Sequence, residues 1–281
     1  MLKQRMLTAV ALIALLVWVL TSQDRQLWSL FLLAVAALAA DEWSQLQRGM
    51  RLPRGAYPVV TVVLLALLVD WPLLRACQPW LLALACGFWV LVVPLWLRQR
   101  WVMRQRVASA LVGWLVILPC ALALQLLRDQ GEVVLFATMA VIWVSDIAAY
   151  FSGRRFGRHR LAPAISPGKT WEGVAGALLA VLLFGVLLCT PGPWHVALQP
   201  LQLAAGMAWF PALALLAVLG IEGDLFESWI KRCAGAKDSG WVLPGHGGVL
   251  DRIDALTAAL PMAALLLQAA RWQESWIQGG P

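Results

Sequence analysis

The segment 222–254 is the longest polar stretch of this chain, and its residue types are suited to phosphate chemistry. Its ionisable side chains are Glu222, Asp224, Glu227, Lys231, Arg232, Lys237, Asp238, His246, Asp251, Arg252 and Asp254. Carboxylates bind hard divalent cations, whereas Lys and Arg neutralise phosphate groups, so the mixture favours a metal-assisted phosphate site. A solvated charged loop has a similar composition, and only the spacing of these residues argues against it.

Asp224 and Asp251 are the carboxylates that we expect to bind the metal. Mg²⁺ takes one or two protein carboxylates and completes its shell with water and substrate phosphates. Asp254 is a third candidate, because it follows Asp251 by three residues and both would lie near one helix N-terminus. An Asp in this position can also cap the helix or pair with Arg252, and that alternative stays open.

The cations of the segment are spaced so that several can contact phosphate together. If the preceding span continues as a helix, Asp224 and Ser228 lie one turn apart, and Lys231 and Arg232 lie one turn after Ser228. Lys then acts as a point charge and Arg through forked hydrogen bonds. The cations expected to neutralise phosphate are Lys231, Arg232, Lys237 and Arg252.

Two glycine-rich turns, 235–240 and 244–248, follow the cations. Glycine lets backbone N–H groups approach a phosphate closely. Asp238 belongs to the first turn, and Gly247 and Gly248 belong to the second. His246 is a candidate base or phosphate donor, although a lone histidine in a turn is more often simply solvated.

Asp146 stands apart, because it lies in the apolar run 141–151. An ionised carboxylate inside a span costs several kcal/mol unless it is paired or solvated, so Asp146 should face the interior of the bundle. There it takes part either in metal or lipid-phosphate chemistry or in a structural pair with an Arg such as Arg154. Asp41 and Glu42 are equally consistent with helix packing and with support of the site.

Gly168-Lys169-Thr170 resembles the end of a nucleotide-binding P-loop but is not one. The P-loop pattern requires glycine where this chain has Pro163, and no strand is expected before it. Ser166 and Lys169 can still form a phosphate-facing turn.

The composition of the chain indicates what must position these residues. Of its 281 residues 61% are hydrophobic and only 13% charged, and the mean hydropathy is +0.75, which excludes a soluble globular enzyme and a disordered chain. We expect an all-α polytopic membrane protein. Nine apolar runs are candidate spans, at 6–21, 26–41, 56–70, 80–97, 107–126, 132–151, 172–190, 201–221 and 253–270. The third is short and the fourth contains Pro94, so a count of eight or ten is the alternative.

The distribution of Lys and Arg predicts the orientation of these spans. With the N-terminus in the cytoplasm, the outer connections hold only Arg25, Arg75, Arg128 and Arg271 of the 22 cations. The cytoplasmic loops 152–171 and 222–254 then carry the chemistry. The net charge of +7 is explained by topology and anionic lipids, and no nucleic acid is expected as a partner. We expect one membrane domain, 1–281, with N-terminal spans in 1–130 and catalytic spans in 131–281.

One extended motif resembles a known family signature. It reads Ser228-x-x-Lys231-Arg232-x4-Lys237-Asp238-x-Gly240-x-x-Leu243-Pro244-x-His246-Gly247-Gly248-x-x-Asp251-Arg252-x-Asp254. This run is similar to the signature of the CDP-diacylglycerol synthases, or phosphatidate cytidylyltransferases. The blocks 146–157 and 165–173 resemble two further family motifs, and Glu42-Trp43 resembles a shorter one; Gly168 departs from the lysine usual at its position.

The resemblance implies condensation of CTP with phosphatidic acid to CDP-diacylglycerol and pyrophosphate, in phospholipid biosynthesis. It implies a requirement for Mg²⁺, a second, monovalent cation such as K⁺, and a homodimer. Carried onto this chain, Asp224 and Asp251 would bind metal, and the phosphate contacts would be Ser228, Lys231, Lys237 and Arg252. We expect the protein in the bacterial inner membrane, with the site facing the cytoplasm.

Two other functions would explain part of this pattern. A CDP-alcohol transferase would carry an Asp-Gly-x-x-Ala-Arg motif followed by paired aspartates, which this sequence lacks. A transporter would also hold Asp146 inside the bundle beside a basic inner mouth, but it should show repeat symmetry between its halves. The charged residues instead cluster toward one end of the chain.

Overall fold

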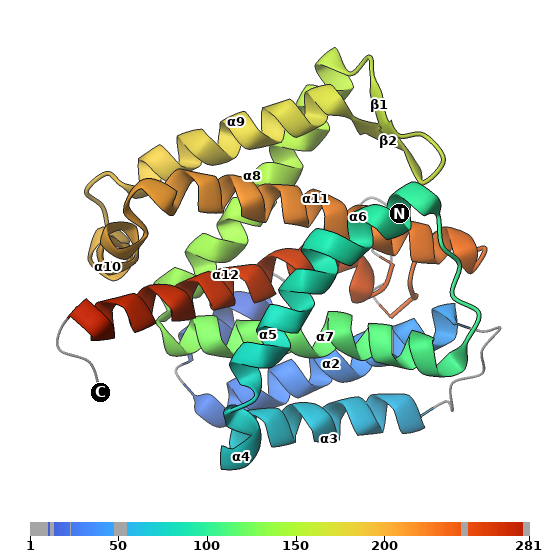
Figure 1. Cartoon of the computed structure of the whole chain (residues 1–281), viewed down its shortest axis with the longest axis horizontal. Coiled ribbons are helices and arrows are strands. Elements are labelled where there is room, and N and C mark those ends of the chain that lie inside the picture. Colours follow the sequence, from blue (N-terminus) through green and yellow to red (C-terminus); the bar gives the residue numbers. More distant parts are fainter. Residues whose placement is uncertain (1–10, 12–13, 23, 48–54, 243–246, 278–281) are drawn as a thin grey trace.

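The computed structural model describes residues 11–277 apart from 12–13, 23, 48–54 and 243–246. These residues form a bundle of helices with a single hairpin near one end (Figure 1). The helices are α2 (Arg25–Leu46), α3 (Ala56–Asp70), α4 (Pro72–Arg75), α5 (Gln78–Gly87), α6 (Val93–Gln99), α7 (Arg106–Asp129), α8 (Glu132–Phe156), α9 (Trp171–Leu188), α10 (His195–Ala205), α11 (Trp209–Cys233) and α12 (Leu250–Ile277). The all-α prediction is confirmed.

The lengths of the helices fit a multi-pass membrane protein. By length and composition, 6 helical stretches of the described chain can cross a membrane: Arg25–Leu46, Pro72–Gln99, Arg106–Asp129, Glu132–Phe156, Trp171–Leu188 and Gly206–Cys233. The third predicted span, 56–70, coincides with the shorter apolar helix α3. Residues 6–10 and 12–13 of the first predicted span, 6–21, lie outside the described residues, and 14–21 are helical. The count of nine and the cytoplasmic N-terminus stay predictions.

Two predicted spans differ from the helices that form. In the fourth span, Pro94 follows a π-helical turn, Phe88–Val92, because proline has no N–H for a regular helical bond and its ring crowds the preceding turn. The expected span 201–221 is interrupted by a short 3₁₀ turn, Gly206–Ala208, and α11 then continues to Cys233. The polar segment 222–254 is therefore helical at both ends, since α12 already begins at Leu250.

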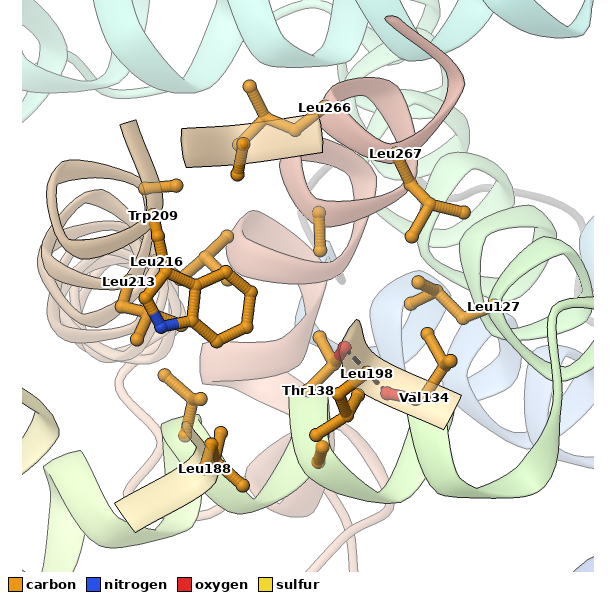
Figure 2. Close-up of a pocket in the computed structure, with 15 residues that line it drawn as sticks. Leu127, Val134, Thr138, Leu188, Leu198, Trp209, Leu213, Leu216, Leu266 and Leu267 are labelled. Atoms are coloured by element: carbon orange, nitrogen blue, oxygen red, sulfur yellow. Dashed lines mark hydrogen bonds between the residues drawn. The ribbon is translucent and has the colours of Figure 1, made fainter. Parts of the chain in front are cut away.

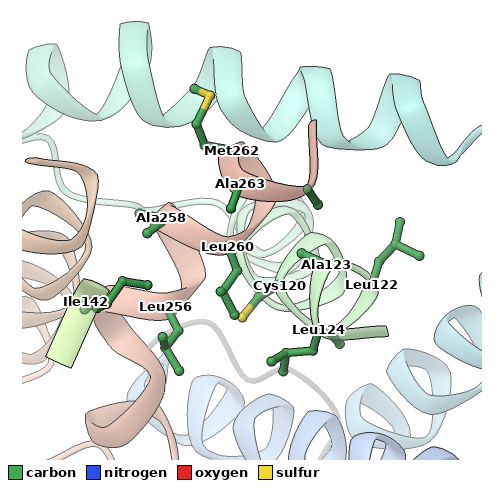
Figure 3. Packing of buried hydrophobic residues seen from close by; sticks show 14 of the residues in the cluster. Cys120, Leu122, Ala123, Leu124, Ile142, Leu256, Ala258, Leu260, Met262 and Ala263 are labelled. Atoms are coloured by element: carbon green, nitrogen blue, oxygen red, sulfur yellow. The ribbon is translucent and has the colours of Figure 1, made fainter. Parts of the chain in front are cut away.

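Helix α12 crosses the middle of the bundle and packs against α11, α7 and α5. Its residues 255–264 carry many alanines and are almost entirely buried, with Ala259 and Leu260 both 0% exposed. Figure 3 shows Leu260 of this helix beside Cys120 of α7, whereas Met262 points away from α7 toward the helix at the top of the view. Small side chains let helices approach closely in a membrane, and these contacts hold α12 between α11, α7 and α5.

The hairpin joins two helices that approach each other very closely. Strands β1 (Arg160–Ala162) and β2 (Ser166–Thr170) are antiparallel, with Arg160 opposite Thr170. A Cβ at Gly176 of α9 would overlap the Ser152 side chain of α8, so these helices can touch only because the residue is glycine. The Thr170 side chain caps α9 by accepting from Gly173 N at 3.2 Å, which places Lys169 directly before the helix.

Candidate active site

A cavity of about 670 Å³ opens where α8, α9, α11, α12 and the hairpin meet. Five of the residues expected to do chemistry line it: Asp146, Lys169, Asp224, Asp251 and Asp254. They come from four separate elements, so the fold collects charges that the sequence keeps apart. A second cavity, enclosed by residues such as Leu127, Leu216 and Trp209, is almost wholly apolar (Figure 2).

Asp224 is oriented by two contacts on opposite sides. Its Oδ2 lies 2.8 Å from Lys169 Nζ, and its Oδ1 accepts from Ser228 Oγ at 3.3 Å. The second contact confirms that Asp224 and Ser228 share one face of a continuing helix. Lys169 also donates to the Ile221 carbonyl at 3.1 Å, so this lysine ties the hairpin to α11.

Asp146 faces the cavity and is exposed there. It lies within electrostatic range of Asp224 and Lys169. The described hydrogen bond of Arg154 goes to the Tyr150 hydroxyl, at 3.1 Å, and not to Asp146. Exposure to a water-accessible cavity explains how a carboxylate is tolerated in this apolar run.

Lys231 lies between two carboxylates. Its Nζ is 2.5 Å from Asp251 Oδ1 and 2.6 Å from Glu227 Oε2, and its side chain is only 13% exposed. Glu227 was not among the expected site residues, although its i,i+4 spacing from Lys231 is a recognisable signal. The structure thus gives Lys231 an ion-pair role beside the cavity, and its contact with phosphate stays a prediction.

The glycine-rich turns close around Asp251. Its Oδ2 accepts from Ser239 N and Gly248 N, both at 2.8 Å. Gly247 has a φ of +80°, and a Cβ there would lie 2.5 Å from Asp251 Oδ2, so only glycine fits. Backbone N–H groups that we expected to face phosphate therefore hold a carboxylate instead.

The other residues expected to contact substrate are not part of the described cavity wall. Arg232 Nε donates to the Ile165 carbonyl at 3.5 Å, while Lys237 and Asp238 are exposed on the loop. His246 lies outside the described residues. Expected residues absent from the described wall are Ser166, Ser228, Lys231, Arg232, Lys237, Asp238, Gly247, Gly248 and Arg252.

Three polar side chains of the wall were not expected from the sequence to contact substrate, and only Arg154 was considered at all, as a partner of Asp146. Tyr150, Arg154 and Arg160 line the cavity, and the two arginines add positive charge opposite the carboxylates. Arg160 Nη1 also donates to the Pro167 carbonyl at 2.5 Å, across the hairpin. The sequence does place Tyr150 and Arg154 in the block 146–157, which resembles a family motif, and Arg160 in the loop 152–171.

The carboxylates of the wall fit a hard cation, because all their donor atoms are oxygens. Among the described residues, no three His, Cys, Asp or Glu side chains converge to hold a metal by themselves. A cation bound among these carboxylates would need further ligands from water or from phosphate.

A charged cavity inside an α-helical membrane bundle is typical of intramembrane enzymes that act on phosphates. The sequence profile of the Cytidylyltransferase family matches residues 3–270, and the chain belongs to that family. It is 39% identical to the phosphatidate cytidylyltransferase of Pseudomonas aeruginosa over 280 residues, covering 97% of this chain and 99% of that protein. The enzymes of the same name from Brucella suis and Haemophilus influenzae are 39% and 34% identical, over 94% and 93% of this chain and 92% and 96% of theirs.

Proposed function

We propose that this protein condenses CTP with phosphatidate, giving CDP-diacylglycerol and pyrophosphate for phospholipid biosynthesis. Membership of the cytidylyltransferase family and the names of its full-length relatives support this reaction. The observation that carries it is the cavity in which Asp146, Asp224, Asp251 and Asp254 face Lys169 and two arginines. Such a cavity can hold two anionic substrates within a membrane protein.

In this reaction an ionised phosphate oxygen of the lipid attacks the α-phosphorus of CTP. The new oxygen–phosphorus bond forms as the bond to the bridging oxygen of the β-phosphate breaks, and that oxygen leaves with pyrophosphate. No protein nucleophile or strong base is required. The main obstacle is repulsion between the two anions, so the chain acts by positioning and by neutralising charge.

The residues of the wall divide this work. Lys169, Arg154 and Arg160 attract the phosphates and hold them near one another. Asp224, Asp251 and Asp254 are the proposed ligands of Mg²⁺, which when bound would neutralise phosphate charge and polarise the α-phosphorus. The monovalent cation and the homodimer implied by the resemblance remain part of this proposal.

A direct assay tests the proposed reaction. Purified protein in detergent micelles containing phosphatidate, with Mg²⁺ and radiolabelled CTP, should convert the label to a lipid-soluble CDP product. Release of pyrophosphate in equal amount should accompany it. Absence of the lipid product over a range of Mg²⁺ and phosphatidate concentrations would refute the proposal.

The lipid is proposed to reach the site through a neighbouring cavity of about 680 Å³. The two cavities share the side chains of Leu161, Val174 and Ile221. The neighbour combines apolar walls with Arg98 and Arg100, which suits an acyl chain with an anionic headgroup.

Val174→Trp should therefore raise the KM for phosphatidate at least ~10-fold, because the larger ring narrows the shared wall, while the KM for CTP changes less than ~2-fold. Leu183→Trp is the matched control, since Leu183 lies on the same helix and is 62% exposed on its outer surface. Steady-state kinetics with each substrate varied separately measures both values. An equal rise in both KM values would contradict this route.

The site is further proposed to face the cytoplasm of a bacterial inner membrane. Cysteines at Val196, 83% exposed, and Trp241, 85% exposed, should report the two sides in a background lacking the native cysteines. An impermeant thiol reagent added to intact cells should label position 196, and position 241 only after the membrane is opened. The reverse pattern would place the site on the wrong side for cytoplasmic CTP.

A further inference from the structure

Glu42 of α2 is buried where it contacts the polar segment from a distant part of the chain. Glu42 is only 1% exposed. Oε1 accepts from Val249 N at 2.7 Å, and Oε2 accepts from Leu250 N at 2.9 Å. The same Oε2 accepts from Ser239 Oγ at 2.8 Å. All three donors lie about 200 residues further along the chain.

Two of these donors belong to the start of α12. The first N–H groups of a helix have no partner within the helix, and a carboxylate near them is favourable because of the helix dipole. A helix is usually capped by a residue just before it. Here Glu42 satisfies the N–H groups of Val249 and Leu250 from another helix, and so it sets where α12 begins relative to α2.

The backbone of the loop lies directly against this carboxylate. A Cβ added at Gly240 or at Gly248 would overlap the side chain of Glu42. Both glycines belong to the recognised signature, and the structure explains why neither position has room for a larger side chain. They let two turns of the loop close around one buried carboxylate.

Ser239 connects Glu42 to the wall of the cavity. Its Oγ is 2.8 Å from Glu42 Oε2 and 3.0 Å from Asp251 Oδ2, and its N–H donates to the same Asp251 oxygen at 2.8 Å. A serine hydroxyl carries one hydrogen, so it donates to one of these carboxylates at a time. Displacement of Ser239 would therefore disturb Asp251, which lines the cavity.

We propose that Glu42 is a positioning residue that holds Asp251 in place through Ser239 and the N-terminus of α12. Burial of a carboxylate is costly unless its hydrogen bonds are complete, and an apolar side chain would pack without this cost. The hydrogen bonds of Glu42 are directed at the loop that carries Asp251. This role rests on the proposed function, in which Asp251 is a ligand of Mg²⁺.

Glu42→Gln tests the proposal, because it keeps the size of the side chain but turns an N–H₂ group toward N–H donors. It should lower kcat roughly 10- to 100-fold, as loss of a partner that orients a ligand does, while the KM for CTP changes less than ~3-fold. Asp41→Asn is the matched control, since Asp41 is the preceding residue of α2 and accepts from Gln45 at 2.6 Å on its own helix. The control should keep kcat within ~2-fold of the parent.

Hydrogen–deuterium exchange of the full-length protein supplies a readout that is independent of activity. In Glu42→Gln, amides of 238–242 and 247–251 should exchange at least ~10-fold faster, with α8 and α9 unchanged. Ser239→Ala should also lower kcat. If Glu42→Gln does not fold, the kcat and loop exchange of Ser239→Ala test the proposal in its place. Unchanged kcat in the folded variants, or a lower kcat with unchanged exchange in the loop, would overturn the proposal. If the parent protein forms no CDP-lipid, the proposed function fails. The exchange comparison still tests whether Glu42 holds the loop and the start of α12 in place.

Discussion

Asp224→Asn should reduce kcat at least ~1000-fold, about 4 kcal/mol of transition-state stabilisation, while the protein remains folded. The Asp224 side chain is 36% exposed, so the packing of the bundle does not depend on its charge. The amide keeps the shape of the side chain but removes the charge that faces Lys169 and that a divalent cation needs. Turnover at several Mg²⁺ concentrations and the melting temperature, measured on one preparation, check this expectation.

A second variant separates the ion pair of Asp224 with Lys169 from the proposed role of Asp224 as a metal ligand. Lys169→Met removes the partner at 2.8 Å but leaves the proposed metal ligand, so it should raise the KM values of the anionic substrates without shifting the Mg²⁺ dependence. Asp224→Asn should instead require more Mg²⁺ for its residual rate. If Asp224→Asn keeps more than ~10% of the parental kcat at saturating Mg²⁺, Asp224 is not an essential ligand.

Asp146→Asn should lower kcat/KM at least ~100-fold with little change in melting temperature. Asp146 faces the charged cavity, where its described electrostatic neighbours include Asp224 and Lys169. A carboxylate buried as the partner of an arginine would behave differently, because its removal orphans a cation and destabilises the fold by ~3–5 kcal/mol. Specific activity and melting temperature of the same purified sample distinguish the two cases.

Asp129→Asn serves as the control for this experiment. Asp129 is an exposed carboxylate at the end of α7, and it accepts from Gln125 at 2.9 Å. It does not belong to the described wall of the charged cavity, so its replacement should leave kcat/KM within ~2-fold of the parent. An Asp146→Asn protein that is active but melts at a much lower temperature would assign Asp146 a structural role only.

Local patterns were sufficient for the helices and for contacts within one helix. Apolar runs of bilayer length predict the class of fold because lipid leaves the backbone no partner outside its own helix. The contact of Ser228 with Asp224 follows from the rise of one helical turn. Asp251 and Asp254, three residues apart on one helix, both line the charged cavity, whereas the other described charged residues of the signature do not.

Interruptions of helices were harder to predict. Pro94 is visible in the sequence, but hydropathy does not show that the turn before it, Phe88–Val92, widens into a π-helix. The break at Gly206–Ala208 lies inside an apolar run with no polar boundary, so hydropathy treats it as one span. Hydropathy measures preference for lipid, and it carries little information on where an apolar helix bends.

The sequence by itself determined that this is an all-α membrane protein with one charged segment suited to phosphate chemistry. Only the tertiary structure decided the partners between distant segments: Lys169 with Asp224, Lys231 with Asp251, and Glu42 with the start of α12. Hydrogen bonds and ion pairs between distant segments depend on how the helices pack, whereas periodicity records only which face of each helix is apolar. Backbone N–H groups on glycine-rich turns can face a phosphate or a carboxylate equally well, and here packing directs those of Ser239 and Gly248 to Asp251.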